Sequence, residues 1–107
     1  MHYTETGFEI RLTGGDTLNF SGDLEKSDYT EVDAFLKKVD QVLISDTCKI
    51  KLDKLKFLNS SGIRSLATFV LGTSKKIEIY INNGVTWQKE SIPTLAYLKP
   101  DRIKIVS

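Results

Sequence analysis

The sequence is poor in the residues that carry most disulfide, metal and nucleophilic chemistry. It contains one cysteine, Cys48, and one histidine, His2, so it can form no internal disulfide and no Cys/His metal cluster. A serine nucleophile needs a general base, and His2 lies at the amino terminus, where we expect a mobile segment. Neither a Gly-x-Ser-x-Gly elbow nor a Walker-type phosphate loop occurs. We therefore expect a protein that is not an enzyme and holds no cofactor.

Long apolar runs and a strong net charge are also missing. No apolar stretch approaches the length of a bilayer span, and the first residues lack the basic and apolar blocks of a signal peptide. The formal net charge is +1, which favours neither nucleic acid nor a membrane surface as a partner. We therefore expect a cytoplasmic location. The 107 residues, of which 40% are hydrophobic, predict a single domain over residues 1–107.

What the sequence does contain is a regular succession of strand and helix patterns. Apolar and polar residues alternate, as in half-buried strands, in residues 8–12, 18–20, 48–52, 77–81 and 103–105. Apolar residues recur at three- and four-residue steps, as in amphipathic helices, in residues 32–43, 63–71 and 92–98. The order is therefore β-β-α-β-α-β-α-β. A hairpin followed by βα units predicts a mixed, mostly parallel sheet.

The alternation also predicts how the layers are arranged. Parallel strands covered on both faces are usually apolar throughout, whereas every strand segment here alternates. We therefore expect a two-layer α/β fold with all helices on one face of the sheet. Cys48 falls on the apolar side of its strand, which predicts a small buried hydrophobe and not a reactive thiol. Trp87 suits the core edge and a partner contact equally.

Turn and cap residues predict where several elements begin and end. The turn chemistry of Ser21-Gly22-Asp23 is expected to end the second strand. Ser27 or Asp28 is expected to cap the first helix, with Glu31 completing a capping box. Ser91 is expected to cap the third helix.

The stretch LNSSGIRSL, residues 58–66, is the most distinctive in the chain. Asn59, Ser60 or Ser61 could each cap the helix that follows. Gly62 is unexpected in the first turn, because glycine is a poor helix former. It suits a backbone that must lie close to something else, such as the surface of a partner.

Two stretches together resemble a known family. IKLDKLKFLNSSGIRSLATFV, residues 50–70, resembles the core of STAS domains, the anti-sigma-factor antagonist family, in which a strand leads through D-S-S-G-L into a helix. FSGDLEKSDYTEVDAFLKKV, residues 20–39, is similar to the family's second signature, a G-E-L-D-like turn into the first long helix. The order of strands and helices agrees over nearly the whole chain. The chain is thus identified as a divergent member of the STAS family, with its two-layer fold.

The resemblance implies a regulatory role in partner switching. Ser60 matches the serine that a partner serine/threonine kinase of the anti-sigma type phosphorylates, and a serine phosphatase would reverse the modification. The chain departs from the family at three positions: Asn59 stands where the family usually has aspartate, Asp23 replaces the glutamate of G-E-L-D, and Glu25 replaces its aspartate. Asn59 can still cap the helix, but it carries no charge.

The resemblance also implies a partner-binding surface at one end of the sheet. The residues expected there are Asp23, Glu25, Asn59, Ser60, Ser61, Gly62 and Arg64. Two alternatives stay open beside the phosphorylated switch. One is a constitutive interaction module of the same fold without phosphorylation, and the other is a module that binds a small ligand. The oligomeric state stays open between a monomer and a weak dimer.

Overall fold

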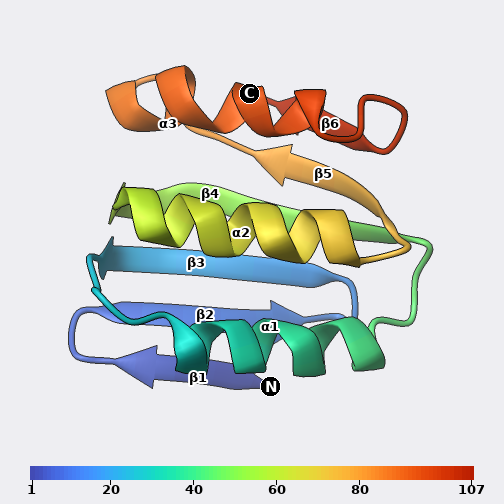
Figure 1. Cartoon of the computed structure of the whole chain (residues 1–107), viewed down its shortest axis with the longest axis horizontal. Coiled ribbons are helices and arrows are strands. Elements are labelled where there is room, and N and C mark those ends of the chain that lie inside the picture. Colours follow the sequence, from blue (N-terminus) through green and yellow to red (C-terminus); the bar gives the residue numbers. More distant parts are fainter.

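A six-stranded sheet forms one layer of the molecule in the computed structural model, which describes residues 1–107. Its strands lie side by side in chain order: β1 (His2–Glu5), β2 (Phe8–Thr13), β3 (Thr17–Leu24), β4 (Thr47–Leu58), β5 (Lys76–Tyr80) and β6 (Ile103–Val106). The other layer contains helices α1 (Thr30–Val42), α2 (Ser60–Gly72) and α3 (Thr86–Ser91), the last continuing into the 3-10 helix η1 (Ile92–Tyr97). Figure 1 shows α1 and α2 lying along the strands.

The sheet is mixed, as predicted. β1, β2 and β3 pair antiparallel, whereas β3, β4, β5 and β6 pair parallel, with helical segments in the connections between the parallel strands. Because parallel strands point the same way, the carboxyl ends of β3, β4 and β5 lie at one edge of the sheet. The helices that follow these strands begin at the same edge, which we call the carboxyl edge.

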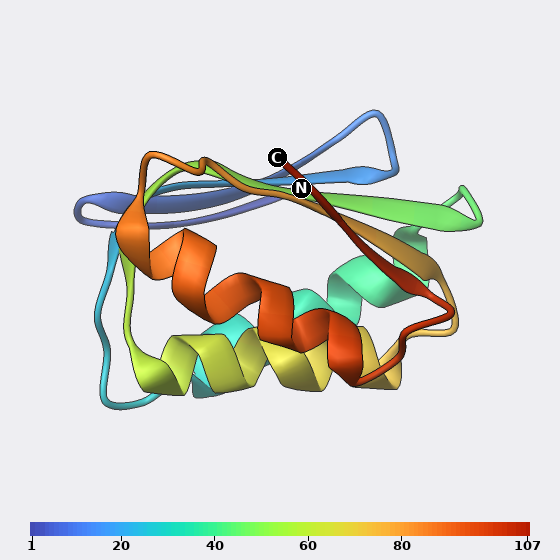
Figure 2. The same ribbon diagram turned by 90° about the horizontal axis from the view of Figure 1, so that it is seen from above.

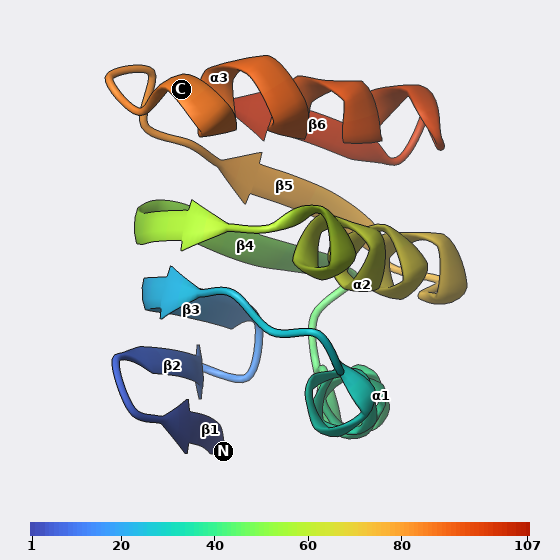
Figure 3. The ribbon, with the colours of Figure 1, turned by 60° about the vertical axis from the view of Figure 1, so that its left-hand side comes forward.

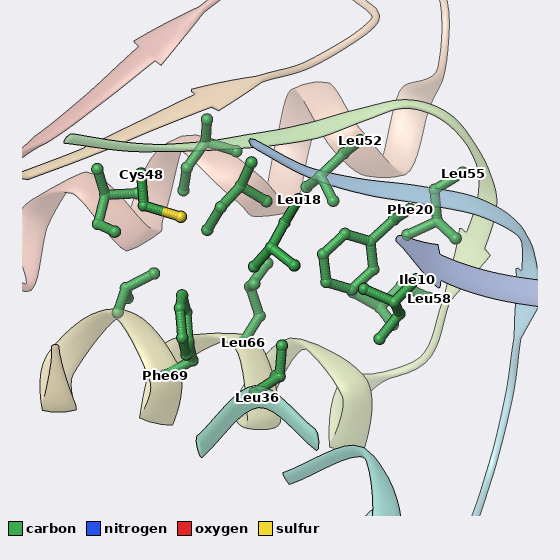
Figure 4. Close-up of a cluster of buried hydrophobic side chains, with 14 of the residues drawn as sticks. Ile10, Leu18, Phe20, Leu36, Cys48, Leu52, Leu55, Leu58, Leu66 and Phe69 are labelled. Carbon is green, nitrogen blue, oxygen red and sulfur yellow. The ribbon is translucent and has the colours of Figure 1, made fainter. Parts of the chain in front are cut away.

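All helices lie on one face of the sheet, which confirms the two-layer prediction (Figure 2). The inward residues of neighbouring strands stand in rows: Leu18 pairs with Ile50, and Ile50 pairs with Ile79, each fully buried. Leu36 of α1 and Leu66 of α2 complete the core from the helical layer (Figure 4). The alternation of apolar and polar residues therefore separates a buried face of the sheet from an uncovered, polar one.

Cys48 lies inside this core, as predicted. Its side chain is fully buried among apolar neighbours. Burial disfavours the thiolate and raises the pKa of the thiol to about 12. Cys48 is therefore a packing residue without nucleophilic character at neutral pH.

The amino-terminal segment is a strand, where a mobile terminus was predicted. β1 pairs with β2 through all four of its residues, and this places His2 opposite Arg11. Tyr3 supplies the packing, because its ring lies 6.4 Å from that of Phe8 and 5.9 Å from that of Phe35. A single half-buried tyrosine among polar residues does not produce an apolar pattern that sequence reading can detect.

β3 and β4 both run further than predicted. Ser21-Gly22-Asp23 does not end β3: the Asp23 N–H donates to the Gly7 carbonyl oxygen at 2.9 Å, and the strand continues to Leu24. β4 continues to Leu58 through two register shifts against β3. Such bulges break the two-residue alternation, which is why the pattern predicted too early an end.

Both α1 and the third helical segment begin at residues other than those predicted. α1 begins at Thr30 with Tyr29 at the cap position, so neither Ser27 nor a capping box with Glu31 closes it. Asp28 instead accepts hydrogen bonds from the Thr30 N–H and hydroxyl, and these lower the pKa of its carboxyl group.

The third helical segment begins at Thr86, five residues before the predicted cap Ser91. Its first turn buries a polar side chain, Gln88, which is fully inaccessible to solvent. Apolar periodicity cannot detect a helix whose innermost residue is an amide. The pattern therefore predicted only the part that is η1.

Candidate functional site

The candidate site lies at the carboxyl edge, where β3 and β4 end beside each other. β3 ends at Leu24 and continues into the loop of residues 25–29, which we call the β3–α1 loop. β4 ends at Leu58, directly before Asn59 and α2. The Asn59 N–H donates to the Leu24 carbonyl oxygen at 3.2 Å and joins the two strand ends. Figure 3 shows the β3–α1 loop and the start of α2 side by side.

Asn59 is the residue that caps α2. Its backbone is extended, and its side-chain Oδ1 accepts the Gly62 N–H at 3.0 Å. The same Oδ1 accepts the hydroxyl of Tyr29, and Nδ2 donates to the Lys26 carbonyl oxygen at 2.8 Å. The three possible caps of the sequence analysis thus reduce to one, and the hydroxyl of Ser60 is not used for the cap.

Gly62 is buried against the protein itself, and not against the surface of a partner. A Cβ atom at this position would lie 2.7 Å from the Tyr29 hydroxyl and would overlap the side chain of Leu58. The glycine therefore permits the β3–α1 loop and the end of β4 to approach the first turn of α2. This corrects the interpretation that an external surface requires the glycine.

Ser60, Ser61 and Arg64 lie in the first two turns of α2. Ser60 is the first residue of the helix and is exposed, and Ser61 is half-buried. Arg64 lies one turn further along, is exposed, and takes part in neither of the chain's two salt bridges. Residues four apart on a helix face the same side, so Ser60 and Arg64 lie on the same side of α2.

The β3–α1 loop presents carboxylates to solvent. Asp23 at the end of β3 and Glu25 and Asp28 in the loop are all exposed. The loop borders an open depression of about 390 Å³ that no hydrophobic side chain lines. This side of the site is therefore polar and acidic, whereas the one charged residue of α2 is Arg64.

Four residues that position this loop were missed by sequence reasoning. The Lys26 ammonium lies 2.5 Å from a carboxylate oxygen of Glu5, and this hydrogen bond lowers the pKa of Glu5 and raises that of Lys26. Tyr3 donates its hydroxyl to the same carboxylate, and burial is the first cause that raises the pKa of Tyr3 to about 12. Burial also raises the pKa of Tyr29. The contacts of Lys26 with Glu5 and of Tyr29 with Asn59 join residues more than twenty positions apart, so no local pattern signals them.

The first turn of α3 braces the end of β4. The Nε2 group of Gln88 donates to the carbonyl oxygens of Leu52 and Leu55 at 2.7 and 2.8 Å, across the bulge in β4. Trp87 Nε1 donates to the Lys56 carbonyl oxygen at 2.7 Å, and the indole packs edge-on against Phe57. Trp87 therefore has a structural role at the edge of the core.

No protein-family model and no curated protein matches the sequence. The chain is similar to the crystal structure of an anti-sigma factor antagonist from Mycobacterium paratuberculosis, with a TM-score of 0.65 over 91% of this chain and 83% of that chain. The chain has a STAS-like fold. Sequence identity is 15%, so the likeness lies in the STAS-like architecture.

The structure also bears on membrane spans and metal sites. None of its helices is both long and apolar enough to cross a lipid bilayer. No group of three or more His, Cys, Asp or Glu side chains lies together in a way that could hold a metal ion.

Proposed function

We propose that the protein is a non-enzymatic, cytoplasmic regulator that binds a serine/threonine kinase of the anti-sigma type and releases it when Ser60 is phosphorylated. A serine phosphatase restores the binding form. The observation that carries the proposal is the position of Ser60, exposed as the first residue of α2 in a STAS-like fold. The family resemblance of the surrounding S-S-G stretch supports the same role.

The partner surface consists of the outward residues at the carboxyl edge. Asp23, Glu25, Ser60, Ser61 and Arg64 are exposed or half-buried there and are available to a protein that docks on this edge. Two other expected contact residues have internal roles: the Asn59 side chain is hydrogen-bonded within the protein, and Gly62 is buried. Asn59 and Gly62 therefore support the partner surface by their contacts within the protein.

The fold can accept a phosphate on Ser60 without unfolding. The first turn of a helix has backbone N–H groups without intrahelical partners, and the helix dipole favours negative charge there. Arg64 lies one turn away on the same side and can pair with the phosphate. Because Asn59 and not Ser60 supplies the cap, modification of the hydroxyl leaves the cap bonds in place.

The same phosphate changes what the surface can bind. It adds roughly −1.5 to −2 charges at a position where a partner packs. Arg64 can offset one of these charges, and burying the remaining negative charge in the interface costs several kcal/mol, on the order of a thousandfold in affinity. Phosphorylation therefore switches binding off at the interface, while the structure of the domain is retained.

Phosphorylation itself is tested by incubating the purified chain with ATP, Mg²⁺ and an extract of the source organism. We expect intact-mass spectrometry to show the addition of one phosphate, and peptide fragmentation to locate it on Ser60. Ser60→Ala should abolish the addition, whereas the neighbouring Ser61→Ala variant should retain it. A phosphate on Ser61 alone, or none in extracts and in cells, would contradict the proposal.

The absence of charge on Asn59 favours a second candidate, a constitutive interaction module with the same surface and no phosphorylation. That candidate predicts an unmodified chain that binds its partner under all conditions. The third candidate, a small-ligand module, has little support at this edge. Ligand pockets are mostly apolar, and the depression beside the loop is lined only by polar residues, namely Glu25, Lys26, Ser27, Asp28 and Glu31.

A further inference from the structure

The amide of Asn59 uses both of its ends, and each end serves a different segment. Oδ1 accepts the Gly62 N–H at 3.0 Å, which closes the first turn of α2. Nδ2 donates to the Lys26 carbonyl oxygen at 2.8 Å, and this bond reaches across to the β3–α1 loop. Tyr29, which is 6% exposed, donates its hydroxyl to Oδ1 from the far end of the same loop.

The loop has few other attachments. The Lys26 N–H donates to the Tyr29 hydroxyl oxygen at 3.4 Å, and the Lys26 ammonium pairs with Glu5 of β1. Glu25 and Asp28, which flank these contacts, are exposed. The hydrogen bonds of Asn59 and Tyr29 therefore hold the loop against the start of α2 from the inside.

An aspartate could perform only half of this task. A carboxylate is an acceptor at both oxygens, so it could cap α2 and accept the Tyr29 hydroxyl as well as the amide does. It could not donate to the Lys26 carbonyl oxygen, and it would place two acceptors against each other. The resemblance leads one to expect aspartate at this position. In this chain the hydrogen bond to the Lys26 carbonyl oxygen requires the amide of asparagine.

We propose that Asn59 and Tyr29 are positioning residues that hold the β3–α1 loop in its binding shape before any partner arrives. The inference rests on the proposed function, because it treats the loop as one half of the partner surface. Neither residue touches the partner. Their effect is to hold the loop that carries Glu25 at a fixed distance from Ser60, so that binding need not order the loop.

The test uses Asn59→Asp, which is isosteric and keeps the cap but removes the donor. Backbone ¹⁵N relaxation of the isolated chain measures the mobility of each segment. We expect the order parameters of residues 25–28 to fall from about 0.85 to below about 0.6, while those of Gly62 and Ile63 stay unchanged. A residue that merely caps the helix would leave the loop unchanged in this variant.

Tyr29→Phe provides a second variant, since it removes only the hydroxyl and keeps the buried ring. It should loosen the same loop residues, whereas the matched control Tyr97→Phe, at an 81% exposed tyrosine, should leave them rigid. If residues 25–28 remain as rigid in both Asn59→Asp and Tyr29→Phe as in the native chain, the inference is wrong.

This experiment separates the inference from the proposed function. The relaxation measurement needs neither a kinase nor a phosphate, so a chain that is never phosphorylated can still show the loosened loop. Conversely, a loop that stays rigid in both variants would overturn the positioning role and leave the switch at Ser60 intact.

Discussion

Replacing Gly22 with alanine is expected to lower the free energy of unfolding by about 4 kcal/mol, among the largest effects of any single substitution in this chain. Gly22 has a φ of +93°, a conformation that strains residues with a Cβ atom. A Cβ atom would also overlap the backbone carbonyl of Gly7, where β2 and β3 meet. Backbone cannot swing aside as a side chain can, so the clash adds to the strain.

Urea unfolding followed by the fluorescence of Trp87, the single tryptophan, measures this effect. Gly72→Ala is the matched control, because Gly72 is the last residue of α2 and has nothing within 4 Å of an added Cβ. It should be neutral or stabilise the protein by up to about 1 kcal/mol. Equal losses for the two variants would refute the role assigned to the Gly22 backbone.

Leu66→Ala is expected to destabilise the protein by about 2–5 kcal/mol. Leu66 lies on the inner side of α2, is 2% exposed and belongs to the central core. Removing its side chain loses burial of apolar surface and leaves a cavity that the surrounding core fills only in part. Because α2 also carries Ser60, this packing holds the candidate site in place.

Leu71 on the same helix provides the control for this prediction. It is 46% exposed near the end of α2, and its replacement by alanine should change the free energy of unfolding by no more than about 0.5 kcal/mol. Chemical denaturation of both variants under identical conditions gives the comparison. A loss at Leu71 as large as that at Leu66 would mean that the assignment of helix faces is mistaken.

The layers of the fold could be predicted from the sequence because they depend on local patterns. Leu18, Ile50 and Ile79 alternate with polar neighbours, and this alternation alone separates a buried face of the sheet from an uncovered one. Phe35 and Leu66 belong to the apolar series at helical spacing in residues 32–43 and 63–71, and the structure places both in the core. The resemblance to STAS domains added the connection between two distant signatures.

The sequence patterns did not predict β1 and α3, and the physical cause is the same for both. Each is fixed by a polar or isolated residue whose partners are distant in sequence. Tyr3 is the only apolar ring that β1 packs onto the core, among polar neighbours, and α3 turns a buried amide, Gln88, onto the carbonyl groups of a bulge in β4. Neither residue type produces a hydrophobic period. Tyr3 packs on Phe35 of α1 and Gln88 bonds to β4, and in both cases the partner is more than thirty positions away in sequence.

The candidate site shows the same division between local and distant information. Ser60 could be found because S-S-G precedes a helical pattern, and Asp23 and Glu25 because they lie in the second signature. Tyr29 matches no position of the G-E-L-D-like turn, although its hydroxyl and the Leu58 side chain are what require a glycine at position 62. Only the folded chain brings these groups within contact distance.

The affinities of Ser60→Ala and Ser60→Asp for the isolated partner kinase test the switch most directly. Both variants should fold with native stability, since Asn59 supplies the helix cap. The account predicts that Ser60→Ala binds as tightly as the unmodified chain, while Ser60→Asp binds at least about a hundredfold more weakly because its charge enters the interface. Equal affinities of the two variants for the kinase would contradict it.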